Sequence, residues 1–165
     1  MGNEDIKFMR LALEEAKLAL KEDELPVGAV VVRGNKVWGK GHRTGDGNTR
    51  LDHGEMRALR EALDRNHKLG NEMTIYTTLE PCVMCFGAIL NSRIKRVVYS
   101  LEDPYGGATH FQPAHMPERH RIKFPEITKG ILRGEVKILF REFFITTQDE
   151  YWSGHPENPL VRVCL

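Results

Sequence analysis

The feature that most constrains this chain is a pair of cysteines, Cys82 and Cys85, where a strand-like run gives way to a helix-like run. The apolar run Thr74–Thr78 precedes them, and Pro81 suits a first helical position. A helix over residues 82–91 would place both sulfurs in its first turn, and residues three apart share a helix face. The free N–H groups and the positive dipole end of that turn favour thiolate over thiol. Two thiolates at a helix start make half of a zinc site.

A second helical pattern, residues 53–66, opens with His53-Gly54-Glu55 and supplies the rest of such a site. His53 is the expected third ligand, which leaves a fourth position for water, as in catalytic zinc sites. Glu55 lies on another side of that helix, so it is better placed to hold a proton beside the water than to bind the metal. A redox role for the cysteines and a structural zinc site are the alternatives. His42 and His67 stay open as a fourth protein ligand.

Strands alternate with helices along the chain, which predicts a layered α/β fold with a sheet covered on both faces. The predicted strands are Val27–Val32, Lys36–Lys40, Thr74–Thr78 and Arg96–Ser100, and the predicted helices are Asp5–Lys21, His53–Asn66, Cys82–Asn91 and Ile127–Phe144. Loops are expected over residues 41–52 and 104–125, and loops at strand ends beside a metal usually carry substrate contacts. With 165 residues, we expect residues 1–165 to form a single domain.

Composition excludes several classes. No apolar run reaches membrane-spanning length, and three cysteines make no disulfide framework, so we predict a cytoplasmic protein without membrane contact, with Cys164 as a free thiol. A net charge of +1 gives little general attraction for nucleic acid. We interpret two basic clusters as solvated charged surfaces and the loop histidines as solvated side chains rather than a second metal site. The clusters are Arg93, Lys95 and Arg96, and Arg119, His120, Arg121 and Lys123; the histidines are His110, His115 and His120.

The His-x-Glu and Pro-Cys-x-x-Cys pattern resembles the signature of zinc-dependent nucleobase deaminases. From about Leu11 to Phe144 the chain is similar to the cytidine deaminase superfamily and, more narrowly, to bacterial tRNA adenosine deaminases. The matching stretches are Glu24–Val30, Thr78–Cys85, Asn91–Ile94 and Glu126–Leu132. The resemblance implies a three-layer α/β/α fold with a five-stranded mixed sheet, and a homodimer. It also implies one zinc ion on His53, Cys82 and Cys85, with Glu55 moving protons during attack of zinc-bound hydroxide on the carbon that carries the amine.

The chain departs from the tRNA enzymes where RNA would be contacted. His42-Arg43 stands where those enzymes have a base-reading asparagine, and Asn48 has a different spacing. Glycine replaces alanine between His53 and Glu55, as in fungal cytosine deaminases. An acid and a tyrosine replace basic residues after Leu101, and an acidic tail replaces an arginine-rich one. Because lost phosphate contacts cost affinity at cellular salt, these departures argue against RNA.

We therefore predict a zinc-dependent hydrolytic deaminase of a small nucleobase, nucleoside or related aminoheterocycle, with nucleic acid disfavoured as a partner. The alternative is a tRNA-specific adenosine deaminase that makes inosine at the anticodon wobble position, and a non-catalytic module with structural zinc is a third hypothesis. The tail, residues 145–165, is expected either to close over the active site or to serve only packing. The predicted substrate contacts are Val27, His42, Asn48, Gly54, Pro81, Asp103, Asp149, Tyr151 and Trp152.

Overall fold

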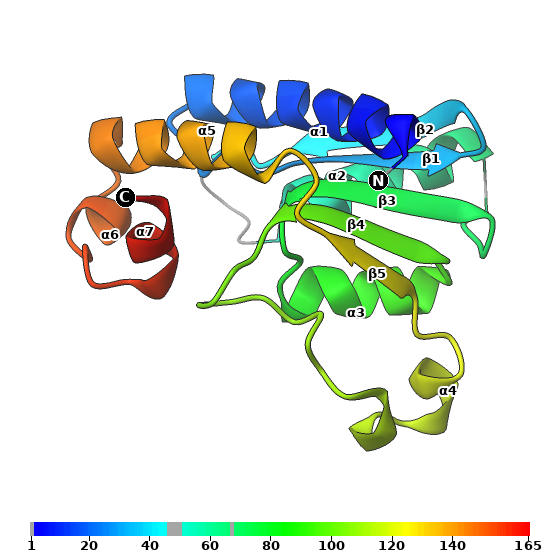
Figure 1. The fold of residues 1–165 in the computed structure, drawn as a ribbon. Coiled ribbons are helices and arrows are strands. Elements are labelled where there is room, and N and C mark those ends of the chain that lie inside the picture. Colours follow the sequence, from blue (N-terminus) through cyan, green and yellow to red (C-terminus); the bar gives the residue numbers. More distant parts are fainter. Residues whose placement is uncertain (1, 46–50, 67) are drawn as a thin grey trace.

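The computed structural model describes residues 2–45, 51–66 and 68–165 and contains a five-stranded mixed sheet between two layers of helices (Figure 1). The strand order is β2-β1-β3-β4-β5, with β1 antiparallel to both neighbours and β3, β4 and β5 parallel. The strands are β1 Gly28–Arg33, β2 Lys36–His42, β3 Met73–Leu79, β4 Arg96–Leu101 and β5 Glu126–Lys129. The predicted three-layer α/β/α architecture is confirmed.

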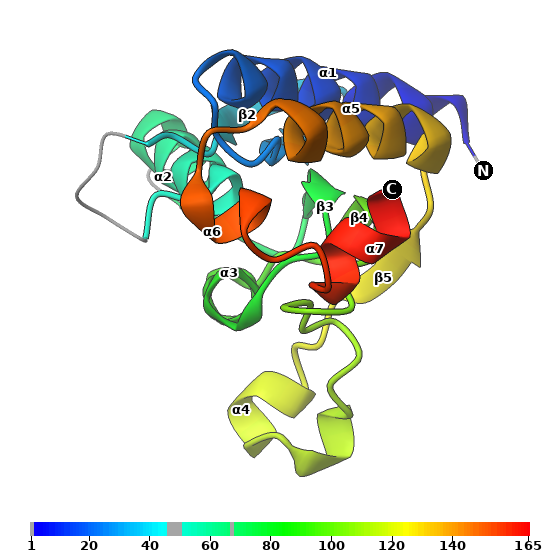
Figure 2. The same cartoon turned by 90° about the vertical axis from the view of Figure 1, so that its left-hand side faces the viewer.

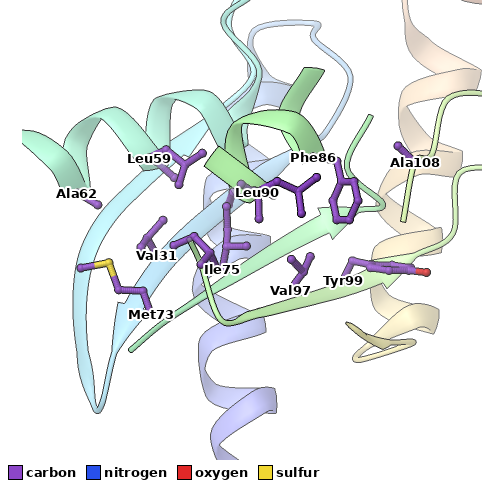
Figure 3. Close-up of a cluster of buried hydrophobic side chains, with 14 residues drawn as sticks. Val31, Leu59, Ala62, Met73, Ile75, Phe86, Leu90, Val97, Tyr99 and Ala108 are labelled. Atoms are coloured by element: carbon purple, nitrogen blue, oxygen red, sulfur yellow. The ribbon is translucent and has the colours of Figure 1, made fainter. Parts of the chain in front are cut away.

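Two helices cover each face of the sheet (Figures 1 and 2). Helices α1 (Asn3–Lys21) and α5 (Arg133–Thr146) lie on one face, and helices α2 (Gly54–Asn66) and α3 (Val83–Ser92) lie on the other. Because the strands are buried on both sides, their side chains are apolar at successive positions. Val31, Ile75 and Val97 pack toward α2 and α3, as Figure 3 shows, whereas the neighbouring Val30, Tyr76 and Val98 pack against α1.

Two glycines let helices approach the sheet closely. A Cβ at Gly28 would lie 2.2 Å from the carbonyl oxygen of Ala12 in α1, and one at Gly39 would lie 2.1 Å from that of Ala58 in α2. Real Cβ atoms do not come so close to backbone, so these positions exclude any side chain. The approach of α2 to the β1–β2 hairpin fixes the helix whose start carries the candidate site.

The predicted start of the last helix at Ile127 was wrong. Residues 127–132 form most of β5 and a turn, and the helix begins only at Arg133. β-Branched Ile127 and Thr128 favour a strand that pairs in parallel with β4. Gly130 then adopts a positive φ of 84°, which ends the strand and turns the chain into α5.

Short helices occupy two regions for which no regular structure was predicted. The segment between β4 and β5 contains the 3₁₀ turn η1 (Pro113–His115) and helix α4 (Glu118–Arg121). The C-terminal segment contains α6 (Glu150–Ser153) and α7 (Pro159–Cys164), and α7 packs on α5 through buried Leu160 and Cys164. No helix in the described part of the chain is long and apolar enough to span a bilayer.

Candidate metal centre and substrate pocket

The N-terminal ends of two helices bring His53, Cys82 and Cys85 together. Cys82 is the N-cap of α3, Cys85 lies in its first turn, and His53 immediately precedes α2. The His53 Nδ1 atom lies 3.6 Å from the Cys82 sulfur and 3.5 Å from the Cys85 sulfur. Tetrahedral zinc with ordinary Zn–N and Zn–S bonds would separate such atoms by about 3.6 Å. The donor set and its spacing therefore fit a zinc ion.

Among the described residues, these three form the one cluster of histidine, cysteine and carboxylate side chains with metal-ligand spacing. His110, His115 and His120 do not belong to this cluster. His42 lies elsewhere, bonded to Glu15, and His67 falls outside the described residues. The cluster thus presents three protein ligands, as catalytic zinc sites do.

The two sulfurs of the cluster share one negative charge. A hydrogen bond from the Cys85 thiol, with a further contribution from His53, lowers the pKa of Cys82 to about 4. The same contact and burial raise the pKa of Cys85 far above its ordinary value, because the Cys82 thiolate disfavours a second anion. The hydrogen bond to Cys82 also raises the pKa of His53. A divalent cation supplies the positive charge with which both sulfurs can be thiolates.

Glu55, in the first turn of α2, is only 2% exposed and faces this cluster. Its Oε2 atom is buried and accepts no hydrogen bond from any described residue. Burial raises the pKa of its carboxyl to about 7. Buried carboxylate oxygens normally have partners, so an unpartnered one beside a metal cluster is typical of a group that acts on a bound molecule.

The cluster opens into a pocket of about 140 Å³. Its lining includes three of the predicted substrate contacts, Val27, Asp103 and Trp152, together with the ligands His53 and Cys82 and the carboxylate Glu55. The sequence analysis did not predict the remaining lining residues, Leu25, Arg43, Leu79 and Glu80. The available signal was proximity in the chain, because Arg43 and Glu80 directly neighbour predicted contacts and Leu25 and Leu79 lie two residues from one.

The other predicted contacts have different surroundings. The Nδ1 atom of His42 donates a hydrogen bond to the Glu15 carboxylate at 2.9 Å, and His42 lines a separate hollow, which gives no geometric support for a role at the pocket. Asp149 caps α6 by accepting a hydrogen bond from the Tyr151 N–H, and the Tyr151 hydroxyl lies 2.7 Å from that of Tyr105. The backbone of Gly54 and of Pro81 flanks the ligands, and Asn48 falls outside the described residues.

Arg43 joins the rim of the pocket to a ligand. Its Nε atom donates to Glu24 at 3.0 Å, and its Nη1 atom lies 3.4 Å from Nε2 of His53. Arg43 therefore contacts the imidazole ring of His53. Sequence comparison alone marked this position only as a departure from an expected asparagine.

Glu80 fixes the loop that carries Asp103 to the pocket. Its Oε1 atom accepts hydrogen bonds from the N–H and hydroxyl of Thr109, at 3.0 and 2.6 Å, and its Oε2 atom accepts one from the Asp103 N–H at 3.2 Å. Gly107 packs so closely on the carboxylate that a Cβ there would lie 2.5 Å from it. Gly107 also bridges to the backbone of Cys82. One buried carboxylate therefore couples the loop to a metal ligand.

Comparison with known families agrees with this geometry. Residues 2–101 match the model of the cytidine and deoxycytidylate deaminase zinc-binding region. The chain belongs to this family, and it is a hydrolytic deaminase that acts on a C–N bond with a zinc cofactor, for which the His53, Cys82 and Cys85 group has the right donor atoms.

Several similar proteins within the family are named for a tRNA substrate. The chain is 37% identical over 141 residues to a tRNA-specific adenosine deaminase of Agrobacterium fabrum, covering 83% of this chain and 91% of that protein. It is 38% identical over 140 residues to a tRNA-specific adenosine deaminase of Rickettsia felis, covering 82% and 97%. A solved structure from a study of A-to-I editing by tRNA:A34 deaminases superposes with a TM-score of 0.70 at 34% identity, covering 81% of this chain and 98% of that one.

These similarities contradict our predicted substrate. A small nucleobase, nucleoside or aminoheterocycle was the wrong expectation, because relatives over most of the chain are named for a tRNA substrate. The prediction counted basic residues segment by segment along the sequence. Such a count misses charges that meet only in the fold, and Lys123 does lie close enough to Arg93 and Arg119 for their charges to lower its pKa, after the larger effect of desolvation.

Proposed function

We propose that this protein is a tRNA-specific adenosine deaminase that converts adenosine to inosine at the wobble position of an anticodon. The observation that carries the proposal is sequence identity of 37–38% to two tRNA-specific adenosine deaminases across more than four fifths of the chain. The intact set of ligands and the buried Glu55 at the pocket add the chemistry that such a reaction needs.

The reaction replaces the amine of adenine with oxygen. Zinc, when bound, lowers the pKa of water enough to supply hydroxide near neutral pH. Glu55 accepts a proton from the water as its oxygen adds to C6, and it passes this proton to the ring nitrogen. The proton of the new C6 hydroxyl group then moves to the amine, which leaves as ammonia, and the carbonyl of inosine remains. The free Oε2 atom of Glu55 is the atom that can hold the proton.

The pocket is of a size for one base. Its volume of about 140 Å³ lies below the ~300–1,000 Å³ of pockets for drug-sized ligands. Leu25, Val27 and Leu79 give it apolar walls, and Trp152 offers an aromatic face. A flat ring can enter such a pocket without its sugar, so a nucleotide would have to be rotated out of its loop, as base-flipping enzymes require.

The test is inosine formation in an anticodon stem-loop RNA whose wobble base is adenosine. The wild type is expected to convert it, and Glu55→Gln is expected to retain one zinc per chain while conversion falls roughly 10²–10⁴-fold. Glu61→Gln, on the same helix but bonded to the Lys40 backbone, is the matched control and is expected to keep its rate. Turnover of a free base with the RNA unchanged would refute the proposal.

We propose further that residues 145–165 belong to the single domain and form a strap along the pocket. Trp152 of α6 lines the pocket and packs on Phe144, with ring centroids 5.5 Å apart. Beyond it, Leu160 of α7 is buried in the core at 1% exposure, so the strap is held on both sides of Trp152. Stacking on a base is worth ~1–3 kcal/mol. Trp152→Ala should therefore raise KM for the stem-loop about 5- to 150-fold. Tyr151→Phe removes only the exposed hydroxyl that bonds to Tyr105 and should leave KM unchanged.

We also propose that the protein is a homodimer and acts in the cytoplasm, where its RNA substrate and reducing conditions are found. Large apolar side chains are exposed on the side of the sheet that carries the ligands. Val83 on α3 is 62% exposed, and Leu63 on α2 is 44% exposed. Sedimentation equilibrium at micromolar concentration should give twice the chain mass, and Val83→Glu should shift it toward the monomer. A monomeric wild type would refute this part.

A further inference from the structure

Two basic segments far apart in the sequence meet at one end of the sheet. Strands β4 and β5 are parallel and start side by side, since Arg96 pairs with Glu126. The residues just before each strand are therefore neighbours, and the Glu126 N–H donates to the carbonyl of Lys95 at 2.9 Å. An edge-to-face contact between Phe124 and Phe86 of α3, 5.5 Å between centroids, holds the second segment in place.

These segments line a groove of about 710 Å³ at the C-terminal end of α3. Its cationic lining residues are Lys68, Arg93, Lys95 and Lys123, and none of its described lining residues is acidic. A nearby hollow lined by Lys40, Arg57 and Arg60 instead contains three carboxylates, those of Glu15, Glu61 and Asp64. Only the first surface, which we call the basic groove, concentrates positive charge on a chain whose net charge is +1.

Stabilisation of the helix dipole of α3 does not account for all of these charges. A cation at the C-terminal end of α3 is favoured by the helix dipole, and Arg93, the C-cap, meets that need. Lys95 and Lys123 take part in no ion pair within the described part of the chain. Arg119 adds its charge beside Lys123. Like charges repel, so Lys95 and Lys123, which have no such ion pair, favour a bound anion.

The distance between the basic groove and the pocket can be compared with the length of an RNA strand. Cys82 and Cys85 stand at the N-terminal end of α3 and the groove at its C-terminal end, and α4 lies beyond α3 on the side away from α6 and α7 (Figure 1). Ten helical residues span about 15 Å. About four or five stacked nucleotides cover that length at ~3.4 Å each. Phosphates of an RNA whose flipped base fills the pocket can thus reach the groove.

We propose that the basic groove binds the phosphate backbone of the substrate RNA, about four or five nucleotides from the one that is deaminated. This inference rests on the proposed tRNA deaminase function and specifies which surface holds the RNA. It supplies the phosphate contacts that the acidic segment after β4 and the acidic tail lack. Lys95 and Lys123 are positioned to neutralise two phosphates.

The test is a salt titration of stem-loop binding by fluorescence anisotropy, with wild type and the double variant Lys95→Gln/Lys123→Gln. Each phosphate contact contributes ~0.7–0.9 to the slope of log affinity against log salt, which at 0.15 M salt corresponds to roughly four- to sixfold in affinity. The double variant should bind roughly 15- to 30-fold more weakly with a slope lower by ~1.4–1.8. Its conversion rate at saturating RNA should equal that of the wild type.

Lys17→Gln/Lys36→Gln removes the same charge from α1 and the β1–β2 hairpin and is the matched control, with no expected change in slope. Lys95→Arg/Lys123→Arg should bind like the wild type, because arginine also neutralises phosphate. If the wild type makes inosine but the double variant binds with unchanged affinity and slope, the groove assignment is wrong and the proposed function stands. If the wild type neither binds nor converts the RNA, both are wrong. Loss of dimer mass in the double variant with an unchanged slope would assign the groove to subunit contact instead.

Discussion

The buried carboxylate of Glu80 offers a direct test of how the pocket is held together. It accepts three hydrogen bonds from residues of one loop, two from Thr109 and one from Asp103. Glu80→Gln keeps the volume but places an amide N–H₂ against at least one of these donors. Losing a hydrogen bond to a charged acceptor costs about 1.5–3 kcal/mol. For a chain of this size, about 2 kcal/mol lowers Tm by about 4–8 °C.

The loop that Glu80 holds also carries Asp103 to the pocket and bridges Gly107 to Cys82. Loosening it should therefore weaken substrate binding as well as the fold. We expect a rise in KM for the stem-loop that persists at temperatures well below the lowered Tm. Differential scanning calorimetry and steady-state kinetics at 20 °C measure the two effects separately.

Glu102→Gln is the matched control for Glu80→Gln. Glu102 lies in the same loop but is partly exposed, and its partners Arg133 and Lys129 are exposed. Such surface pairs contribute about 0–1 kcal/mol. The Tm of Glu102→Gln should therefore fall by only a small part of the decrease seen in Glu80→Gln, and its substrate affinity should not change. Equal behaviour of the two variants, or a Glu80→Gln enzyme with wild-type Tm and KM, would refute the reasoning.

Three further predictions concern the centre and the fold. Cys85→Ser should abolish stoichiometric zinc, measured by atomic absorption after gel filtration, because three ligands become two strong ones. Gly28→Ala should cost about 3 kcal/mol or more, seen in urea denaturation, because its Cβ would meet the α1 backbone at 2.2 Å. Asp5→Asn should cost about 2 kcal/mol at pH 7, because Arg96 donates two hydrogen bonds to this carboxylate and holds its pKa below the ordinary value. Because the pKa of Asp5 is lower in the folded than in the unfolded chain, its ionisation stabilises the fold at pH values above the unfolded-state pKa. The loss of stability in Asp5→Asn should therefore shrink as pH falls below about 4.

The metal centre was predictable from the sequence because its geometry is local. Cys82 and Cys85 stand at the start of α3, and His53 and Glu55 at the start of α2, so spacing indicates each half of the site. The resemblance to the deaminase signature is what joined the two halves. The layered fold was equally accessible, since β-branched runs alternate with amphipathic helices. What spacing could not give is which loop residues reach the pocket. Arg43 and Glu80 arrive there through contacts with Glu24 and Thr109, which no periodicity encodes.

The error about β5 also concealed how the basic residues are arranged. Residues 127–129 were predicted as helix, and a helix there would not pair with β4 or place the preceding basic segment beside it. As a strand parallel to β4, the same residues bring Lys123 next to Arg93 and Lys95, because parallel neighbours begin at the same edge of the sheet. The basic groove exists only in that topology. A four-residue strand therefore decides whether this sequence is interpreted as one that has lost its phosphate contacts or as one that has moved them.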